Sequence, residues 1–561
     1  MCGIGLIVFV RSGSKVEIKN KSNLLETEEE NLPNDMNIVE AKLTELLRER
    51  GNDKVEKFVL DISEDVKMVI IGCLLSLRGK EAFPIPYKDE GGNILAWNGE
   101  IFGGKVVVEE GENDTEVLSK ELADSKDFLG TMEGINGPYS IIYWKNSSKE
   151  VFFGRDFIGR RSLVYRMRTS IKSKEGWEAA IIVSSASITD RFDEGNWKQI
   201  PLSLTQPFEQ SKSSWYELPC GEDMYSISFD EEEDVTKLVL GRLNRKSCFL
   251  KRDIVEPSFE GEEKQVDWED CASKLQEVLS MAVKRRVTDI RNISVQEEES
   301  SICKVGILFS GGIDSMVLAG LSDVHIHPNQ RIELINVSFG RGDSKFKTKD
   351  RKSAIKGLEE LKRISPNPNR QWTLKEVNVT PEMMERDKHK IFSLMYPCTT
   401  CMDFNIGFSF FYAASGAEKR YRVLLSGLGA DETLGGYGRH RKSFEEGGWK
   451  AFQAEIEKDI SKIWKKNLGR DDRCISANMV EARFPFLDEQ VQNFVSSLPP
   501  WFLSDFSQPR GFGEKRLLRQ VGKRMGFSQP FFTKKKAAIH HGSKSASLTN
   551  NLINSLSKRD K

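Results

Sequence analysis

The second residue of the chain is a cysteine, and this position gives it chemistry that an internal cysteine lacks. Removal of the initiator methionine leaves Cys2 with a thiol and a free α-amino group on one residue. An α-amine has a reference pKa of about 7.7 to 8.0, so near neutral pH part of it is unprotonated and accepts the thiol proton directly or through water. Judged by its position alone, Cys2 would more often be an unreactive residue before a strand than a nucleophile. Residues further along the chain decide between these interpretations.

Three further segments carry residues suited to an amino acid substrate, and each stands beside an expected strand or helix. They are Ser76-Leu77-Arg78-Gly79 after one strand, Trp97-Asn98-Gly99-Glu100-Ile101 after another, and Asn113-Asp114-Thr115-Glu116 at the start of a helix. Each alone has a structural explanation, since Asn-Gly is a common turn and Asp a common helix cap. In this order, and with Met-Cys-Gly-Ile-Gly at the N-terminus, they resemble the type 2 glutamine amidotransferases.

This resemblance implies a role for each residue and a fold. The implied fold is an α+β N-terminal-nucleophile hydrolase sandwich. The Asn98 side chain and the Gly99 backbone N–H would stabilise the oxyanion that forms when Cys2 attacks glutamine. The planar guanidinium of Arg78 suits the α-carboxylate of glutamine, and Asp114, helped by Glu100, suits its ammonium group. The implied glutamine-binding set is therefore Arg78, Asn98, Gly99, Glu100 and Asp114.

A second candidate site lies in the other half of the chain, where an apolar strand is followed by a glycine turn and a helix. The strand at residues 304–309 runs into Ser310-Gly311-Gly312-Ile313-Asp314-Ser315, and a helix at residues 316–321 follows. Glycines let backbone N–H groups approach phosphate oxygens, and the helix N-terminus adds partial positive charge. Asp314 would repel phosphate by itself, so a Mg²⁺ ion between them is the natural inference. A Gly-Gly pair alone would indicate only a turn.

The hexapeptide resembles the PP-loop of ATP pyrophosphatases, which cleave ATP between the α and β phosphates. It lacks the lysine and the glycine spacing of Walker and Rossmann motifs. Later segments at residues 425–432, 435–437, 481–488 and 515–519 narrow the resemblance to the asparagine synthetases. This resemblance implies that the second domain activates a carboxylate, aspartate in this family, as an acyl-adenylate with release of pyrophosphate. Ammonia from the first domain would then attack the activated acid.

Residue roles in the second site also follow from the resemblance. Pyrophosphate would be held by Ser310, Gly311, Gly312, Asp314 and Ser315. Ser426 and Gly427 would lie near the adenosine, and Asp314 and Asp431 would be the metal candidates. Lys536 would stabilise negative charge on the leaving phosphate, and Lys534 and Lys535 are the other candidates for this role. The alternative for all three lysines is that they only form a solvated basic surface. The implied small molecules are glutamine, ATP, Mg²⁺ and aspartate.

Two segments depart from the family. In glutamine-dependent asparagine synthetases, a glutamate regarded as a base in amide formation occupies the position of Leu428. Leucine cannot accept a proton, so either another group serves, with Glu432 the nearest carboxylate in sequence, or the synthetase reaction is weak, altered or absent. The stretch at residues 396–403 also differs from the family and leaves the acceptor open. Its Cys398-x-x-Cys401 pair has no second pair at zinc-like spacing, so we expect two partly buried thiols.

Three functions fit these motifs. A glutamine-hydrolysing amidotransferase and ATP-dependent ligase is favoured by two multi-part motifs in family order. A binding or regulatory scaffold that keeps the fold is the alternative, suggested by Leu428. The third is an enzyme with a different product, because the same acyl-adenylate chemistry can close a β-lactam ring or amidate other acids. Cys2 argues against a ring-closing enzyme, since ring closure needs no ammonia.

The elements that must position these residues differ between the two halves. The first half has short strand patterns at residues 66–77, 94–97, 139–144, 151–154 and 180–184, and helical ones at 38–50 and 115–122. The second half alternates strands at 304–309, 331–339, 372–377 and 422–425 with helices, which predicts a parallel sheet covered on both faces. We therefore predict two domains: an amidotransferase domain at 2–245, a linker at 246–265, and an α/β PP-loop domain at 266–561.

Composition limits the partners. The 561 residues include 83 Lys plus Arg and 84 Asp plus Glu, a net charge of -1 that does not favour nucleic acid. Nine cysteines without a repeating spacing indicate a reducing compartment, so we expect a cytoplasmic protein. No uncharged apolar stretch approaches the ~20 residues of a membrane helix. The apolar run at residues 3–10 is expected to be a buried first strand rather than a signal peptide.

Overall fold

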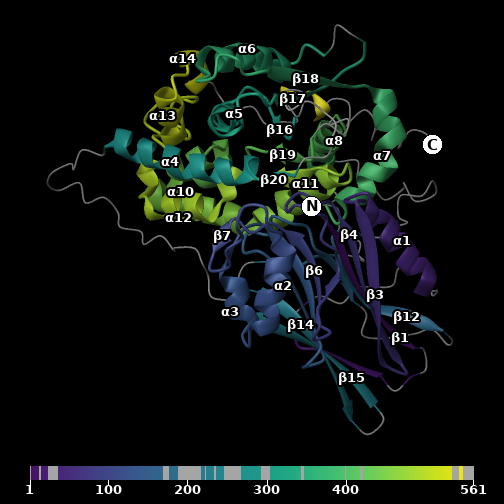
Figure 1. The fold of residues 1–561 in the computed structure, drawn as a ribbon. Helices are drawn as coiled ribbons and strands as arrows, with labels where there is room; N and C mark the ends of the chain where they lie inside the picture. The colour runs from purple at the N-terminus through teal and green to yellow at the C-terminus, as the bar shows by residue number, and fades with distance from the viewer. Residues whose placement is uncertain are drawn as a thin grey trace, which may run out of the picture.

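The computed structural model contains two large β-sheets in the first half of the chain and one in the second (Figure 1). It describes residues 2–11, 14, 16–22, 24, 36–167, 176–187, 216–220, 223–232, 235–244, 267–291, 303–342, 346–398, 400–416, 421–533 and 542–546. The predicted linker at 246–265 lies outside these ranges, so the predicted boundaries of the domains at 2–245 and 266–561 stay predictions.

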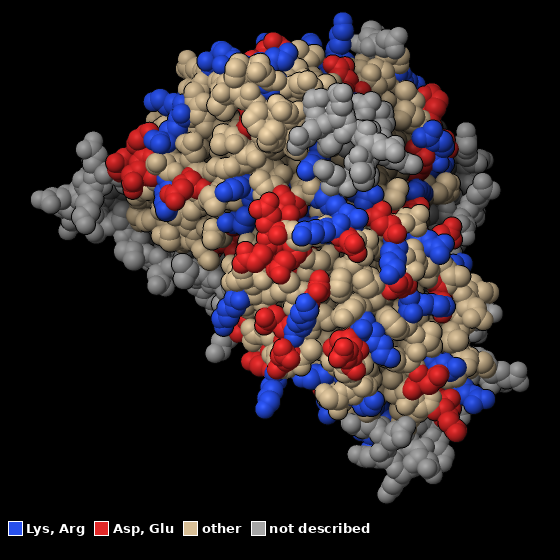
Figure 2. Space-filling model, viewed as in Figure 1, with Lys and Arg blue, Asp and Glu red and all other residues tan. Residues whose placement is uncertain are grey.

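Charged side chains of both signs are interspersed over the face seen in Figure 2, in keeping with the net charge of -1. Within the described ranges, no helix is both long enough and apolar enough to cross a membrane.

The six-stranded sheet carries Cys2 immediately before its strand β1. Its strands, in spatial order and all antiparallel to their neighbours, are β13 (Tyr216–Glu217), β11 (Val164–Met167), β12 (Trp177–Ser184), β1 (Gly3–Arg11), β4 (Val66–Leu74) and β3 (Lys54–Ser63). In β1, Leu6 pairs with Val183 on one side and with Ile70 on the other. This inner position explains why the first strand is buried as far as its last residue but one.

The seven-stranded sheet faces the six-stranded sheet across a shared core. Its strands, in spatial order, are β2 (Val16–Asn20), β15 (Val235–Asn244), β14 (Asp223–Glu232), β10 (Glu150–Arg155), β9 (Tyr139–Lys145), β6 (Ile94–Gly99) and β5 (Tyr87–Lys88). The β2 and β15 strands run parallel, and the other pairs are antiparallel. Ile4 and Leu6, which share one face of β1, pack in one cluster with Ile142 and Phe153 of the facing sheet.

Helices cover the outer faces of this pair of sheets. The α1 helix (Met36–Arg48) packs on the six-stranded sheet, where Leu43 and Leu47 share a cluster with Ile7 and Phe9. The α2 (Asp114–Asp124) and α3 (Phe128–Glu133) helices pack on the seven-stranded sheet, and a small sheet joins β7 (Gly103–Gly104) to β8 (Ile135–Asn136). The first half therefore has four layers: helix, sheet, sheet and helix. Its assignment to the N-terminal-nucleophile hydrolases rests on the sequence motifs and stays a prediction.

A five-stranded parallel sheet forms the centre of the second half, which confirms the predicted α/β architecture there. Its strands, in spatial order, are β18 (Trp372–Val379), β17 (Ile332–Phe339), β16 (Val305–Leu308), β19 (Val423–Leu425) and β20 (Glu481–Arg483). The helices around it are α4 (Trp268–Val287), α5 (Ile313–His325), α6 (Lys349–Ile364), α7 (Pro381–Met395), α8 (Cys401–Ser415), α9 (Ala430–Leu434), α10 (Gly438–Ile463), α11 (Gly469–Ser476), α12 (Glu489–Ser497), α13 (Arg516–Arg524) and α14 (Gln529–Phe532). A short π-helix at Trp464–Leu468 and short 3-10 helices at Pro485–Leu487 and Pro500–Phe502 complete this half. The β17 strand is buried along nearly its whole length because both of its faces are covered.

The strand order places a topological switch between β16 and β19. From β16 the chain moves outward to β17 and β18, then crosses back to β19 on the other side of β16. In open parallel sheets, ligands bind outside the carboxyl ends of the strands at such a switch. Both segments predicted to bind the nucleotide, residues 310–315 and 426–427, directly follow these two strands.

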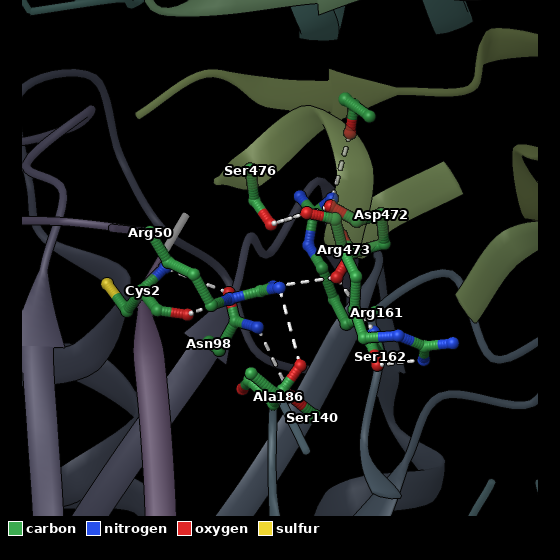
Figure 3. Close-up of polar contacts among 12 residues, drawn as sticks. Cys2, Arg50, Asn98, Ser140, Arg161, Ser162, Ala186, Asp472, Arg473 and Ser476 are labelled. Atoms are coloured by element: carbon green, nitrogen blue, oxygen red, sulfur yellow. Dashed lines mark hydrogen bonds and ion pairs between the residues drawn. The ribbon is translucent and has the colours of Figure 1, made fainter. Parts of the chain in front are cut away.

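The two halves meet across a buried set of charges close to Cys2 (Figure 3). The Asp472 carboxylate of α11 accepts hydrogen bonds from the Arg50 guanidinium at 2.6 Å and from the Ser162 backbone N–H at 3.1 Å. The adjacent Arg473 donates to the Ser162 hydroxyl at 2.7 Å and pairs with Glu217. All five side chains are buried. An unpaired charge at this depth is strongly destabilising, so these pairs fix how the two halves dock.

Asp472→Ala should destabilise the chain more than the size of the change suggests, because it leaves the Arg50 guanidinium buried without its carboxylate. We expect the free energy of unfolding to fall by about 3–5 kcal/mol, measured as a lower midpoint of urea unfolding. Asp124→Ala, which removes an exposed carboxylate from α2, should shift the midpoint little. Equal midpoints for the two variants would contradict the role of Asp472 in docking.

Candidate active sites

Cys2 directly precedes β1, and its backbone nitrogen lies against Asn98 of β6 (Figure 3). This nitrogen donates to the Asn98 side-chain oxygen at 3.0 Å, and the Asn98 amide nitrogen donates to the Ser140 hydroxyl at 3.3 Å. The Arg50 guanidinium donates to the Cys2 carbonyl at 3.4 Å. In the full-length chain this nitrogen is the amide of the bond to Met1, so it stands in for the α-amine that loss of Met1 would leave. The structure thus brings together two of the residues predicted to be catalytic.

The thiol of Cys2 lies in a dry environment. Burial of the side chain raises the pKa of the Cys2 thiol, while the positive chain terminus and the Leu75 backbone act to lower it. A thiol with a raised pKa is mostly protonated near neutral pH and needs a base before it can attack. The reactivity of Cys2 therefore depends on a neighbouring proton acceptor such as the α-amine.

Arg78 and Asp114 meet beside Ile101. Asn113 caps α2 by accepting a hydrogen bond from the Thr115 N–H, so the helix starts at Asp114. The Asp114 carboxylate accepts from the Ile101 N–H at 2.9 Å, and Arg78 donates to the Ile101 carbonyl at 2.8 Å and lies 3.5 Å from Asp114. Burial raises the pKa of Asp114, and the Arg78 charge acts to lower it. The result is a cation next to an anion, the arrangement that complements the two charged groups of a free amino acid.

Glu100 contacts the second half of the chain. Its carboxylate pairs with Arg483 of β20 at 2.5 Å, and burial raises the pKa of Glu100 to about 7 although Arg483 acts to lower it. No local signal reveals this pair, because its members are 383 positions apart. The neighbouring Gly99 pairs with Tyr139, and a Cβ at Gly99 would lie 2.6 Å from the Cβ of Tyr139. Close packing of the strands therefore requires glycine at that position.

The segment from Phe309 to Ser315 turns sharply after β16 and enters the first turn of α5. Gly311 has a φ of 66°, and a Cβ there would lie 2.4 Å from the Ser353 carbonyl oxygen. Gly312 donates its N–H to the Ser310 hydroxyl at 3.3 Å, and the Ser315 hydroxyl donates to the Gly312 carbonyl at 3.1 Å. Both serine hydroxyls are thus engaged with the loop itself, and a phosphate that takes them must replace these bonds.

A buried lysine joins the two aspartates predicted to bind the metal. The Lys515 ammonium lies 2.5 and 2.7 Å from the oxygens of Asp314 and 3.0 Å from Asp431. Burial lowers the pKa of Lys515, and Asp314 acts to raise it. The sequence offered Lys515 only as part of a segment that resembles the family. Its position in the structure makes it a candidate site residue that the sequence did not reveal.

The two carboxylates fit a Mg²⁺ ion, which is commonly bound by one or two carboxylates with phosphate oxygens and water completing its shell. Over the ranges that the structure describes, no group of three or more His, Cys, Asp or Glu side chains forms a metal site alone. A magnesium ion at Asp314 and Asp431 would therefore need oxygen atoms from a bound nucleotide.

Ser426 and Gly427 lie against the same loop. A Cβ on Gly427 would stand 3.1 Å from the Asp314 Cβ. The Ser426 N–H donates to the Arg483 carbonyl at 2.9 Å, continuing the pairing of β19 with β20. The structure thus brings residues 310–315, 426–427 and Asp431 together at the topological switch of the sheet.

Leu428 comes directly after Gly427, and Glu432 lies four residues further along the chain. The Leu428 N–H donates to the Ser426 hydroxyl at 3.3 Å, and the leucine side chain packs against the core of the second half. Glu432 is buried, which raises its pKa, and it accepts hydrogen bonds from the Tyr437 hydroxyl at 2.6 Å and from the Gly429 N–H at 3.1 Å. Both carboxylate oxygens of Glu432 are thereby engaged in shaping the loop. This geometry disfavours Glu432 as a replacement for the glutamate that the family has at position 428.

The remaining predictions concern the lysines at residues 534–536 and the cysteine pair at 398 and 401. Lys534, Lys535 and Lys536 lie outside the described residues, so the prediction for Lys536 is not tested. The Cys398 thiol lies 3.7 Å from the Lys465 carbonyl, and burial raises the pKa of both Cys398 and Cys401. Raised pKa values disfavour thiolate chemistry at this pair.

Known proteins are similar to this chain over most of its length. The sequence model of the asparagine synthase family matches residues 286–447 and 443–559. Asparagine synthetase domain-containing protein 1 from Bos taurus is 31% identical over 604 residues, which cover 90% of this chain and 92% of that protein. The Homo sapiens protein of the same name is 30% identical, with 90% of this chain and 91% of that protein covered. A glutamine-hydrolyzing asparagine synthetase from Mus musculus is 24% identical and covers 76% of this chain and 68% of that protein.

Gly311→Ala should distort the loop that follows β16. The left-handed backbone alone costs about 1–2 kcal/mol for alanine, and the clash with the Ser353 carbonyl adds to it. We expect a lower thermal midpoint than for Gly312→Ala, because Gly312 has a φ of -85° and its nearest neighbour is a serine hydroxyl at 3.3 Å. Equal midpoints for the two variants would show that the loop tolerates a side chain at Gly311.

Proposed function

Because the chain belongs to the asparagine synthetase family, we propose that it hydrolyses glutamine at Cys2 and uses the ammonia to form an amide. Its second half would activate the acceptor acid with ATP. One observation carries this proposal: the nitrogen of Cys2 lies 3.0 Å from the Asn98 side chain, and the charge of Asp114, which pairs with Arg78, acts on the Cys2 thiol. A nucleophile, an amide group and a site for a free amino acid are all required for glutamine hydrolysis.

In the proposed first reaction, the free α-amine of Cys2 takes the proton of its own thiol. The thiolate attacks the amide carbon of glutamine, the oxyanion is stabilised by Asn98 and Gly99, and ammonia leaves with the transferred proton. Water then releases glutamate from the thioester. Burial of Cys2 makes the amine essential, since the raised pKa keeps the thiol protonated without a base.

In the proposed second reaction, residues 310–315 and Lys515 hold the triphosphate of ATP while the acceptor carboxylate attacks the α-phosphate. The backbone N–H groups of the loop and the start of α5 favour negative charge at this point. Asp314 and Asp431 are the residues that would hold Mg²⁺, which would supply positive charge to balance that of the pyrophosphate. Ammonia then attacks the acyl carbon of the resulting acyl-adenylate, and the amide forms as AMP leaves. Aspartate is the proposed acceptor, and the reaction would be asparagine synthesis.

A second candidate function is a nucleotide-binding scaffold with little or no synthetase activity. Leu428 favours it, because the side chain cannot accept a proton and Glu432 is engaged by Tyr437 and Gly429. The name of the Bos taurus and Homo sapiens relatives describes a domain and no reaction. ATP binding without pyrophosphate release, in the presence of aspartate and related acids, would select this function over the first.

We also propose a reducing compartment, with the cytoplasm as the simplest choice. None of the eight cysteines in the described part of the chain forms a disulfide bond.

Cys2→Ala should abolish the release of glutamate from glutamine, because no other group replaces its thiol. The variant should still bind ATP with the affinity of the wild type. The matched control is Cys73→Ala, which removes a buried thiol from β4 in the same sheet and should keep glutamate release. Wild-type rates for Cys2→Ala in a coupled glutamate assay would exclude Cys2 as the nucleophile.

Lys515→Gln should lower the rate of pyrophosphate release by at least about tenfold, while glutamate release stays near the wild-type rate. The substitution removes the ammonium group that pairs with both Asp314 and Asp431, so the loop would present two carboxylates to the triphosphate. Lys523→Gln, at an exposed position of α13, is the control for loss of charge. If Lys515→Gln releases pyrophosphate at the wild-type rate, residues other than Lys515 bind the triphosphate.

A further inference from the structure

A carboxylate of the second half occupies Arg78, the residue predicted to bind the carboxylate of glutamine. Asp289 lies just beyond the end of α4, and one of its oxygens accepts hydrogen bonds from two nitrogens of Arg78, Nε at 3.2 Å and Nη2 at 3.1 Å. These two nitrogens form the side of the guanidinium that pairs with carboxylates in a bidentate manner. Asp289 therefore sits where an amino acid substrate would place its own carboxylate.

The hydrogen-bonding capacity of Arg78 shows how little room remains for a second carboxylate. A guanidinium has five N–H donors. Four are engaged in the structure: two with Asp289, one with the Ile101 carbonyl at 2.8 Å, and one weakly with Asp114 at 3.5 Å. A substrate carboxylate that needs two parallel hydrogen bonds cannot obtain them while Asp289 stays in place.

We propose that Asp289 controls the affinity of the first site for glutamine by competing with the substrate carboxylate for Arg78. This inference rests on the proposed function of that site. Glutamine binds when its carboxylate displaces Asp289 from the Nε and Nη2 edge of Arg78. Residues of both halves of the chain would then determine how tightly glutamine binds. The sequence predicted glutamine-binding residues in the first half alone.

The segment that carries Asp289 is firmly attached, so a turn of its side chain is the movement required. The Arg291 N–H donates to the Leu77 carbonyl at 2.9 Å, and the Arg291 guanidinium donates to the Ser76 hydroxyl at 2.6 Å. Ile290 is buried in one cluster with Leu77. The Asp289 side chain itself keeps 25% of its surface exposed, compared with 12% for Arg78. Water can therefore receive the displaced carboxylate without movement of the backbone.

The same segment connects to the second site. Arg483 donates to the Arg286 carbonyl at 2.7 Å, near the end of α4, and its guanidinium also pairs with Glu100. The Arg483 carbonyl accepts the N–H of Ser426, which follows β19 at the predicted nucleotide site. Arg483 thus contacts the end of α4 and the glutamine site through its side chain, and the loop at Ser426 through its backbone carbonyl.

The test measures glutamine binding by titration calorimetry in the full-length chain with Cys2→Ala, so that no glutamine is consumed. Adding Asp289→Asn removes the competing charge and should make glutamine bind about fivefold more tightly, the effect of removing a partly exposed ion pair. Asparagine is well suited to this position because Asp289 has a φ of 49°, a left-handed conformation that asparagine adopts readily. The fold should therefore be unchanged.

Asp270→Asn, at the exposed start of α4, makes the same substitution at the far end of the helix that precedes Asp289, and should leave glutamine affinity unchanged. Equal or weaker binding in Asp289→Asn than in its parent overturns the inference, since a carboxylate that helps to hold the substrate ammonium would give that result. If glutamine binds but the wild-type chain releases no glutamate, the proposed function fails while the competition stands. No binding by either variant overturns both.

Discussion

The pairing of Asp472 with Arg50 is the interaction on which the rest of the structure depends. It lies between the two halves, it is buried on both sides, and the same Arg50 guanidinium contacts the Cys2 carbonyl. Breaking such a pair costs far more than a surface contact, because each remaining charge stays in a medium of low polarity. The start of β1, and with it the candidate nucleophile, is therefore positioned by a side chain that the second half holds in place. Neither half has a complete version of this arrangement.

Both candidate sites share a second electrostatic feature: the positive charges proposed to bind ligands already have partners inside the protein. Arg78 is paired with Asp289, and Lys515 with Asp314 and Asp431. These pairs keep buried charges compensated when no ligand is bound. Each ligand must then exchange its own charge for an internal one, so the net gain on binding is smaller than the contacts alone suggest.

Much of the framework followed from the sequence, because local patterns determine it. The strand expected at 331–339 is β17 (Ile332–Phe339). The strand expected at 304–309 is β16 (Val305–Leu308), so the loop after it begins one residue earlier than predicted. The patterns missed β3 and β15, where apolar residues mix with charged ones in half-exposed strands. Asp289, Lys515 and Arg483 were not recognised as site residues either. Their roles come from contacts across the fold, and no spacing in the chain reports which carboxylate a distant basic residue will meet.

The central claim is that nitrogen released at Cys2 reaches an acid activated at the PP-loop of the same molecule. The most direct measurement supplies the chain, freed of Met1, with ATP, Mg²⁺, candidate acids and glutamine that carries a heavy nitrogen isotope in its side-chain amide. Mass spectrometry then identifies the products. The account predicts a new amide that contains the heavy nitrogen, and loses it when Cys2 is replaced by alanine. Heavy ammonia without any labelled amide, for every acid including aspartate, would contradict it.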